Sequence, residues 1–250
     1  MNDRHKNRAK PATVAVPPHE IYRTHMLELK LRLRRTEAVA KATSAVTGLA
    51  ALDAEFCFLQ IRRMIELVTF SAALREETRY RKLREIQRVE RPRDHGDPTK
   101  DWEAAEILKR LSEISAHSLP IPIKAISGTG PGTWHIDRSA TSVTHGRLIE
   151  IYKKCGGFLH AKNPIGRSFP TFVEEERARY DCAPTEIQRC LQFLRELVWR
   201  HAVVSLEWFD DLDPREPANP QAAWLVDLGD EDQQSISIVL AEAMNIEGKP

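Results

Sequence analysis

The longest uninterrupted hydrophobic pattern in the chain runs from Leu52 to Leu74, with the sequence LDAEFCFLQIRRMIELVTFSAAL and no glycine or proline. Apolar residues recur at intervals of three and four, which is the spacing of one face of an α-helix. A second apolar line lies on another face of the same stretch. A helix that is apolar on most of its circumference is expected to be covered on several sides, so the pattern predicts a central helix. The first face consists of Leu52, Phe56, Leu59, Leu67, Phe70 and Leu74, and the second of Cys57, Ile61, Met64, Ile65 and Val68.

Helical patterns also precede and follow the central stretch. Gly48 separates the first of them from the central helix. After Leu74 the chain becomes almost entirely charged, which predicts an exposed, ion-paired extension of the central helix as far as Val89. Pro184 fits the first turn of the last helix, because proline lacks the N–H group that is unused there. The other predicted helices span 19–47, about 101–115, 144–163, 171–180 and 184–201.

The last fifty residues change from a helical to an alternating pattern. VVSLEWF, AWLVDLG and SISIVLAEA each alternate apolar and polar positions, as half-buried strands do. The polar GDEDQQ between the last two predicts a hairpin. We therefore expect a small antiparallel sheet at the C-terminus, packed on the helical body.

A stretch rich in proline and glycine, 118–138, interrupts the helical region. Its prolines exclude a central strand, so the sequence predicts a loose hairpin or an irregular excursion. The GTGPG within it is not a phosphate-binding loop, because no Lys-Ser/Thr pair and no helix start follow it.

These patterns define the expected fold class, which is mainly α (α+β): a multi-helix body around a long central helix with a small C-terminal antiparallel β-sheet. The expected organisation is a disordered basic arm over 1–18, a helical domain over 19–201, and the sheet over 202–250.

Composition indicates an ordinary globular protein of 250 residues, with 42% hydrophobic and 29% charged residues. The net charge of +1 means that nucleic-acid binding would need a local basic patch. No apolar run is long enough for a membrane-spanning helix, so no membrane partner is expected. The four cysteines form no C-x-x-C pair, which favours reduced thiols in a cytoplasmic protein. Nine histidines form no metal-binding motif, so neither a metal nor another cofactor is predicted.

Candidate chemistry is concentrated in Tyr152–Pro164, YKKCGGFLHAKNP, at the end of a predicted helix. His160 could exchange a proton near neutral pH, although a histidine at a helix end is often structural. Glu66 in the central helix is either part of a site or a structural ion pair with Arg62 or Arg63. The lysines and Asn163 are candidates for holding phosphate and positioning a leaving oxygen. The candidate substrate-binding residues are Lys153, Lys162, Asn163 and Tyr152.

Lys154 precedes His160 with five residues between them, and Glu66 lies on another predicted helix. This arrangement resembles the HEPN domains, small all-α proteins that include many dimeric ribonucleases of bacterial toxin and phage-defence systems. The resemblance covers roughly residues 50–165 and implies that His160 is the base, Lys154 holds the phosphate and Glu66 orients the basic group. It also implies RNA as substrate, a homodimer and catalysis without metal. Lysine replaces the usual arginine here, so bidentate phosphate contact is lost. Cys155 also stands where a polar residue is common in the family.

The FCFLQ helix and the Y-x-x-C-G-x-x-L-H segment also resemble a set of bacterial helical proteins without an established activity. The leading functional hypothesis is a HEPN-like, metal-independent ribonuclease, or a degenerate relative, in bacterial defence or regulation. One alternative is a non-enzymatic interaction or scaffold protein that uses the central helix and the C-terminal sheet for docking. Another is a nucleic-acid-binding module that uses Arg32, Arg34, Arg35 and the Arg75–Arg91 segment.

Overall fold

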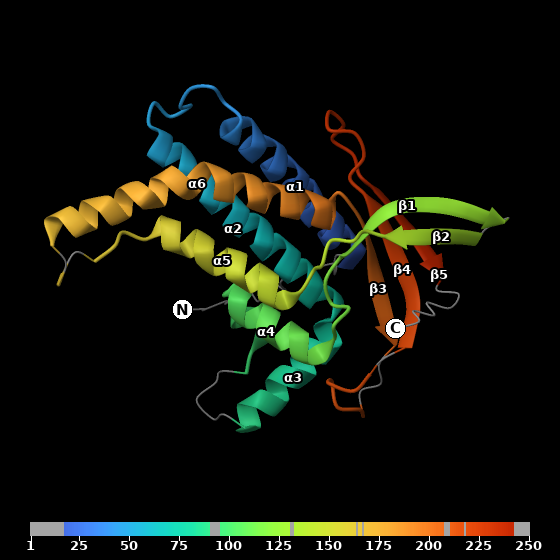
Figure 1. The fold of residues 1–250 in the computed structure, drawn as a ribbon. Coiled ribbons are helices and arrows are strands. Elements are labelled where there is room, and N and C mark those ends of the chain that lie inside the picture. The colour runs from blue at the N-terminus through green and yellow to red at the C-terminus, as the bar shows by residue number, and fades with distance from the viewer. Residues whose placement is uncertain are drawn as a thin grey trace, which may run out of the picture.

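The computed structural model describes residues 18–90, 96–130, 133–163, 165–166, 168–207, 211–217 and 219–242. Within them a body of helices lies beside one antiparallel sheet (Figure 1), which confirms the predicted fold class. The predicted disordered arm over 1–18 lies outside the described residues except for Pro18, which begins the first helix. The helices are α1 (Pro18–Ala40), α2 (Ala50–Arg75), α3 (Glu77–Glu90), α4 (Ala104–Ile114), α5 (His145–Leu159) and α6 (Phe169–Val198), with a short 3₁₀ helix at Pro98–Lys100.

The predicted central helix is α2, which packs against α1, α4, α5 and α6. Its second apolar line faces the interior, where Phe58, Ile61, Met64 and Ile65 are fully buried. These side chains belong to the same hydrophobic core as residues of the sheet such as Val226. The helices and the sheet therefore share one core.

The charged segment after α2 differs from its prediction as an exposed extension. The chain leaves helical geometry at Glu76 and starts a separate helix, α3. The buried residues of α3 recur at intervals of one, three and four, so they lie on one face of the helix. Two arginines, Arg79 and Arg84, lie on that face with Tyr80 and Leu83. A segment that looks uniformly polar in sequence thus buries long charged side chains through specific partners.

The two helices predicted over 171–180 and 184–201 are a single helix, α6, with Pro184 in its interior. Pro184 has no N–H group to donate to the Tyr180 carbonyl, so α6 lacks one main-chain hydrogen bond at this point. The helix continues because the residues that follow, Ile187, Leu191 and Leu194, are all buried in the core. Packing therefore overrides the local stop signal.

The sheet has the order β2-β1-β3-β4-β5 and is antiparallel throughout the described residues. The excursion over 118–138 forms a hairpin, which was one of the two predicted alternatives. Its first strand also pairs with β3 at Ile121–Ala202 and Pro122–His201, so it lies between β2 and β3, and the prediction that the prolines exclude a central strand is wrong. Both residues lie at the start of that strand, where a proline is tolerated. The strands are β1 (Ile121–Gly130), β2 (Thr133–Arg138), β3 (Arg200–Glu207), β4 (Asn219–Asp227) and β5 (Ser237–Glu242).

A buried tyrosine–histidine pair joins the sheet to α1. The Tyr22 hydroxyl lies 2.7 Å from Nε2 of His201, and Nδ1 of the same ring lies 2.8 Å from the Val198 carbonyl. Because a carbonyl only accepts, Nδ1 carries the proton and Tyr22 donates to Nε2. Burial, with a smaller contribution from the charge of Arg75, lowers the pKa of His201 from 6.5 to about 4. The imidazole is therefore held neutral at the junction.

A buried lysine attaches the β4–β5 connection to α1. The Lys30 ammonium donates to the main-chain carbonyls of Leu228, Asp230 (2.7 Å) and Ser235 (3.3 Å). The residue is only 3% exposed, so these carbonyls replace the water that an ammonium group would otherwise need. The three contacts match its three N–H donors.

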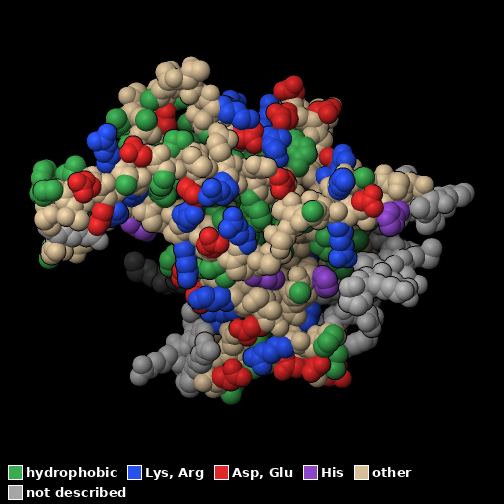
Figure 2. Space-filling model, viewed as in Figure 1, with side chains coloured by type: hydrophobic (Ala, Val, Ile, Leu, Met, Phe, Trp, Pro, Cys, Tyr) green, Lys and Arg blue, Asp and Glu red, His purple; other side chains and the backbone are tan. Residues whose placement is uncertain are grey.

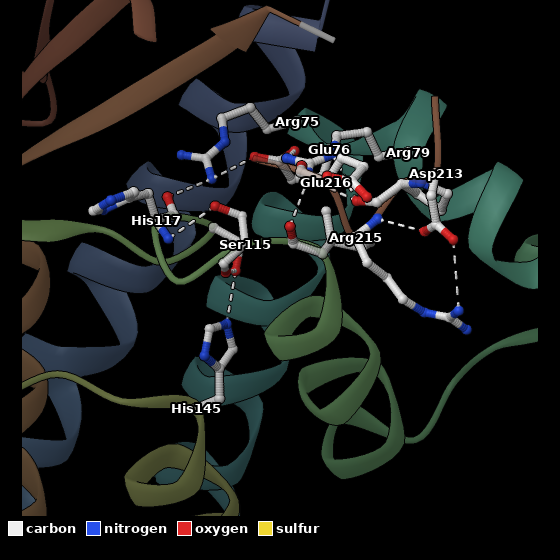
Figure 3. A network of polar contacts seen from close by, with 12 residues as sticks. Arg75, Glu76, Arg79, Ser115, His117, His145, Asp213, Arg215 and Glu216 are labelled. Atoms are coloured by element: carbon white, nitrogen blue, oxygen red, sulfur yellow. Dashed lines mark hydrogen bonds and ion pairs between the residues drawn. The ribbon is translucent and has the colours of Figure 1, made fainter. Parts of the chain in front are cut away.

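Two arginines at the α2–α3 junction hold the end of α4 and the segment 211–217 (Figure 3). Arg79 donates to the carbonyls of Ile114 (2.6 Å), Pro214 (2.6 Å) and Glu216 (2.9 Å). Arg75 donates to the His117 carbonyl at 3.0 Å and to Glu76 at 3.1 Å. These side chains are almost fully buried, so the contacts fix segments that are distant in sequence.

The buried His201 predicts acid-sensitive folding. Above about pH 6.5 the ring is neutral in both the folded and the unfolded chain, and its contribution to stability is fully present. As the pH falls towards 4, only the unfolded chain takes up this proton, so the free energy of unfolding falls by on the order of 3 kcal/mol. Below that range the folded chain is protonated too, and this loss stops.

Urea unfolding at a series of pH values tests this expectation. His201→Gln should flatten the acid limb of the stability curve, whereas His117→Gln, at an exposed position, should leave it unchanged. An acid limb that is equally steep in His201→Gln and the parent would contradict it.

Candidate functional site

The predicted site residues lie along α5 and just beyond its end. Thr144 caps the start of α5, since its hydroxyl accepts the Arg147 N–H at 3.1 Å. His160 ends the helix, and its own N–H donates to the Gly156 carbonyl at 3.2 Å. Gly156 lies against α2: a Cβ at this position would be 3.1 Å from Nη1 of Arg62. The absence of a side chain there allows the two helices to approach closely.

Glu66 and Tyr152 meet where α2 faces α5. The Arg62 guanidinium lies 3.9 Å from the centre of the Tyr152 ring and donates to its hydroxyl at 2.5 Å. Glu66 accepts from Arg63 at 2.8 Å, pairs with Arg62 at 3.5 Å and accepts from the Tyr152 hydroxyl at 3.4 Å. Burial is the main cause that raises the pKa of Tyr152. Glu66 thus pairs with both Arg62 and Arg63, as expected if its role is a structural ion pair.

The lysines of the segment contact a different helix. Lys154 forms an ion pair of 2.7 Å with Glu186 of α6, and this hydrogen bond raises the lysine pKa and lowers that of Glu186. Lys162 lies 3.3 Å from Glu176 and 3.6 Å from Glu175. Carboxylates of α6 thus balance both positive charges. Of the remaining candidates, Lys153 is exposed, and the Asn163 side-chain oxygen accepts the Ile165 N–H at 2.9 Å.

His160 is exposed to solvent, and within the described part of the chain its ring has no hydrogen-bond partner. Only its main chain is engaged, through the Gly156 carbonyl and through Arg179, which lies 3.5 Å from the His160 carbonyl. The structure therefore brings Glu66 and Tyr152 together. Lys154 instead contacts α6, and the His160 ring faces solvent.

The arginine-rich segments are largely engaged in contacts within the protein. Arg75, Arg79 and Arg84 are buried, Arg81 pairs with Glu77 at 2.6 Å, and Arg32 pairs with Glu28 at 2.6 Å. On the face shown in Figure 2, Lys and Arg side chains are interspersed with Asp and Glu. This face has a mixed charge pattern, unlike the single-sign surface that follows a nucleic-acid backbone.

The described residues contain no cluster of three or more histidine, cysteine or acidic side chains that could hold a metal ion. None of the helices in the described ranges has the length and hydrophobicity needed to span a bilayer. A partly open cavity of about 260 Å³ lies between the end of α1, the start of α2 and α6. Its lining includes Ala40, Ala54, Cys57 and Pro184 but none of the predicted site residues.

Sequence reasoning missed an exposed hydrophobic surface on α2, which we call the α2 stripe and define as Leu49, Leu52, Phe56 and Leu59. These side chains are 56%, 47%, 38% and 43% exposed; Leu49 is the N-cap of α2, and the other three lie within this central helix. They recur at intervals of three, four and three, so they form one continuous line. The spacing of Leu52, Phe56 and Leu59 shows that they share one apolar face, but this face was expected to be covered by other elements.

Neighbouring helices cover the other sides of α2 and leave the stripe open. On one side, Gln60 accepts from Arg32 of α1. On another, Phe58 stacks on Phe158 of α5 with ring centres 3.8 Å apart. Glu55 accepts from Tyr180 of α6 at 2.6 Å. The stripe is thus the part of α2 that these three helices do not reach.

Charges along the stripe change sign with position. Asp53 and Glu55 accompany its first half, whereas Arg62 and Arg63 follow its end. Arg63 is the more accessible of the two arginines, with 58% of its side chain exposed against 23% for Arg62. The stripe therefore runs from an acidic end to two arginines whose charges Glu66 partly balances, with Arg63 still accessible to solvent.

Comparisons with protein-family models, with curated proteins and with solved structures find no match to this chain. The fold and these surfaces define a mainly helical α+β protein whose central helix exposes a hydrophobic line.

The contrast between Phe56 and Phe58 gives a direct test of this description. Phe58 is fully buried, so Phe58→Ala should lower the free energy of unfolding by about 3–5 kcal/mol. At concentrations at which the chain is a single copy, Phe56→Ala should cost clearly less, about 1–2 kcal/mol, because part of its side chain already contacts water. Chemical denaturation measures both, and equal losses in the two variants would show that the stripe is covered.

Proposed function

We propose that the protein is a non-enzymatic interaction protein that binds an amphipathic helix of a protein partner on the α2 stripe. The observation that carries this proposal is the exposure of four large apolar side chains in line on a helix whose other sides are packed. A line of this kind loses contact with water when a second apolar helix covers it, which favours binding.

The spacing of the stripe favours a helix as the bound element. Intervals of three, four and three are those of the a and d positions of a coiled-coil seam. The same intervals continue to Arg63 and Glu66, where the seam becomes charged. A helix lying along α2 would therefore place its own apolar line on Leu52, Phe56 and Leu59 and meet charge beyond them.

The size of the stripe also supports binding. Its four side chains together expose on the order of 400 Å² of apolar surface, a size at which an exposed patch is often functional. The proposal places this binding in a reducing cytoplasm, which the four free cysteines support. Burial raises the pKa of Cys155 to about 12 and of Cys57 to about 11, so these two are packing residues rather than nucleophiles.

Binding of a synthetic amphipathic helix tests the proposal. A labelled peptide of about three heptads, with leucine at the a and d positions, should bind the protein in a fluorescence-anisotropy titration. Phe56→Glu should weaken that binding by at least about tenfold, because it places a charge in the centre of the stripe.

The matched control is Val89→Glu, which adds the same charge at an exposed apolar position on α3 and should leave binding unchanged. A scrambled peptide of the same composition should not bind. Equal affinity for the parent and for Phe56→Glu would overturn the proposal.

A metal-independent ribonuclease that acts on RNA is a second proposal, and it rests on the resemblance to HEPN domains. Two observations support it: Glu66 and Tyr152 meet between α2 and α5, and His160 is exposed next to this helix pair. In this version His160 is the base and Lys154, released from Glu186, holds the phosphate.

His160→Ala tests the ribonuclease. Cleavage of a labelled RNA in a chelator should fall by about a hundredfold or more if His160 is a general base. The melting curve should stay unchanged, because the ring is exposed. His117→Ala, at another exposed position, is the matched control. RNA that stays intact with the parent protein, or is cut equally by His160→Ala, would contradict this proposal.

A further inference from the structure

We infer that the helix bound on the α2 stripe is α2 of a second copy of this chain, lying antiparallel to the first. This inference rests on the proposed function and names its partner. It follows from the order of charges along the stripe and from the area that two copies would bury.

The charge order makes the stripe complementary to itself in one direction only. Glu55 lies beside the first half, and Arg63 lies at the end. When two such helices cross antiparallel, the acidic half of one copy meets the basic end of the other, and the two-fold symmetry gives this contact twice. In a parallel arrangement Arg63, which continues the line of the stripe, would meet the partner's Arg63 and lie about two turns from the partner's Glu55, so the attraction is lost and the two arginines repel.

A specific register satisfies the apolar residues as well. With Phe56 opposite the partner's Leu59, Leu52 lies against the carbon stem of the partner's Arg63, and Glu55 lies near its guanidinium. Antiparallel coiled coils pair residues of the a line with residues of the d line in this manner. Arg63 is 58% exposed, so its side chain is accessible to a second molecule while it also pairs with Glu66.

The area agrees with a dimer. A standard interface buries about 800 Å² on each partner, of which somewhat more than half is apolar. The stripe provides on the order of 400 Å² of apolar surface per copy, and the charged residues beside it supply the polar rim. A second copy thus covers the stripe with a surface of matching size, spacing and charge.

Charge exchange tests both the partner and its direction. The mass of the full chain is measured over a concentration series by light scattering or sedimentation, and the parent should be a dimer. Arg63→Glu alone places two glutamates together and should weaken the dimer by at least about tenfold. Glu55→Arg alone places two arginines together and should do the same. An equimolar mixture of the two variants should restore the dimer, because both cross pairs regain opposite charges.

Two neutral variants serve as controls. Glu55→Gln keeps a side-chain oxygen that can accept from Tyr180, and Arg63→Gln removes the charge without reversing it. Both should weaken the dimer less than the charge reversals. Circular dichroism melting of each variant shows that the fold is retained.

The outcomes separate this inference from the proposed function. A dimer that is indifferent to both reversals overturns the antiparallel arrangement. A parent that stays monomeric but binds the synthetic helix overturns the second copy as partner and leaves the proposed function in place. A monomer that binds no helix overturns both.

Discussion

The covering of α2 is the constraint on which the rest of the structure depends. This helix is apolar on most of its circumference, so the chain must place other elements around it. Helices α1, α4, α5 and α6 all pack on it, and their arrangement follows from the need to bury Phe58, Ile61, Met64 and Ile65. The packing is complete on those sides and ends at the α2 stripe. The line that remains in contact with water is the part of this apolar surface that the described residues leave exposed.

Buried polar groups set how the sheet sits on the helices. Apolar side chains can stay in contact when two elements shift slightly past each other. Breaking a buried hydrogen bond instead costs free energy, because its donor and acceptor are left unpaired. Tyr22 with His201 fixes β3 against α1, and the Lys30 ammonium fixes the β4–β5 connection against the same helix. Arg79 does the same for the end of α4 and the segment 211–217. These long-range contacts all join residues far apart in the sequence.

Periodicity predicted the elements well where a single face decides the structure. The helices now called α1, α2 and α5, the strands β3 to β5 and the mainly helical class all follow from spacing, although α1 ends at Ala40 and not near residue 47 as predicted. The misses arise where tertiary packing overrides a local signal. Pro184 reads as a helix start, yet burial of the following turn keeps α6 continuous. The prolines of 118–138 argue against a central strand, yet Pro120 and Pro122 stand just before and at the start of β1, where it joins β3.

The candidate site shows the same limit. The pairing of Glu66 with Arg62 and Arg63 could be predicted, because residues three and four apart on a helix are neighbours. The pairing of Lys154 with Glu186 could not, because it depends on how α5 and α6 pack. The exposure of Leu52, Phe56 and Leu59 was also beyond prediction, since spacing shows that a face is apolar without showing what covers it. The catalytic roles of His160, Lys154 and Glu66 that the resemblance to HEPN domains implies stay predictions.

Pro184 lies at the middle of α6, and the two halves of this helix differ in burial. Its second half is anchored by Ile187, Leu191 and Leu194, while most residues of its first half are exposed. The first half is tied down mainly by Arg179, which donates to the Phe158 carbonyl, and by Tyr180, which donates to Glu55. Because one main-chain hydrogen bond is missing between the two halves, the first half can unfold locally without the second. Amide protons of α6 before Pro184 should therefore exchange with solvent long before those after it, and a protease should cut α6 more readily before Pro184 than after it.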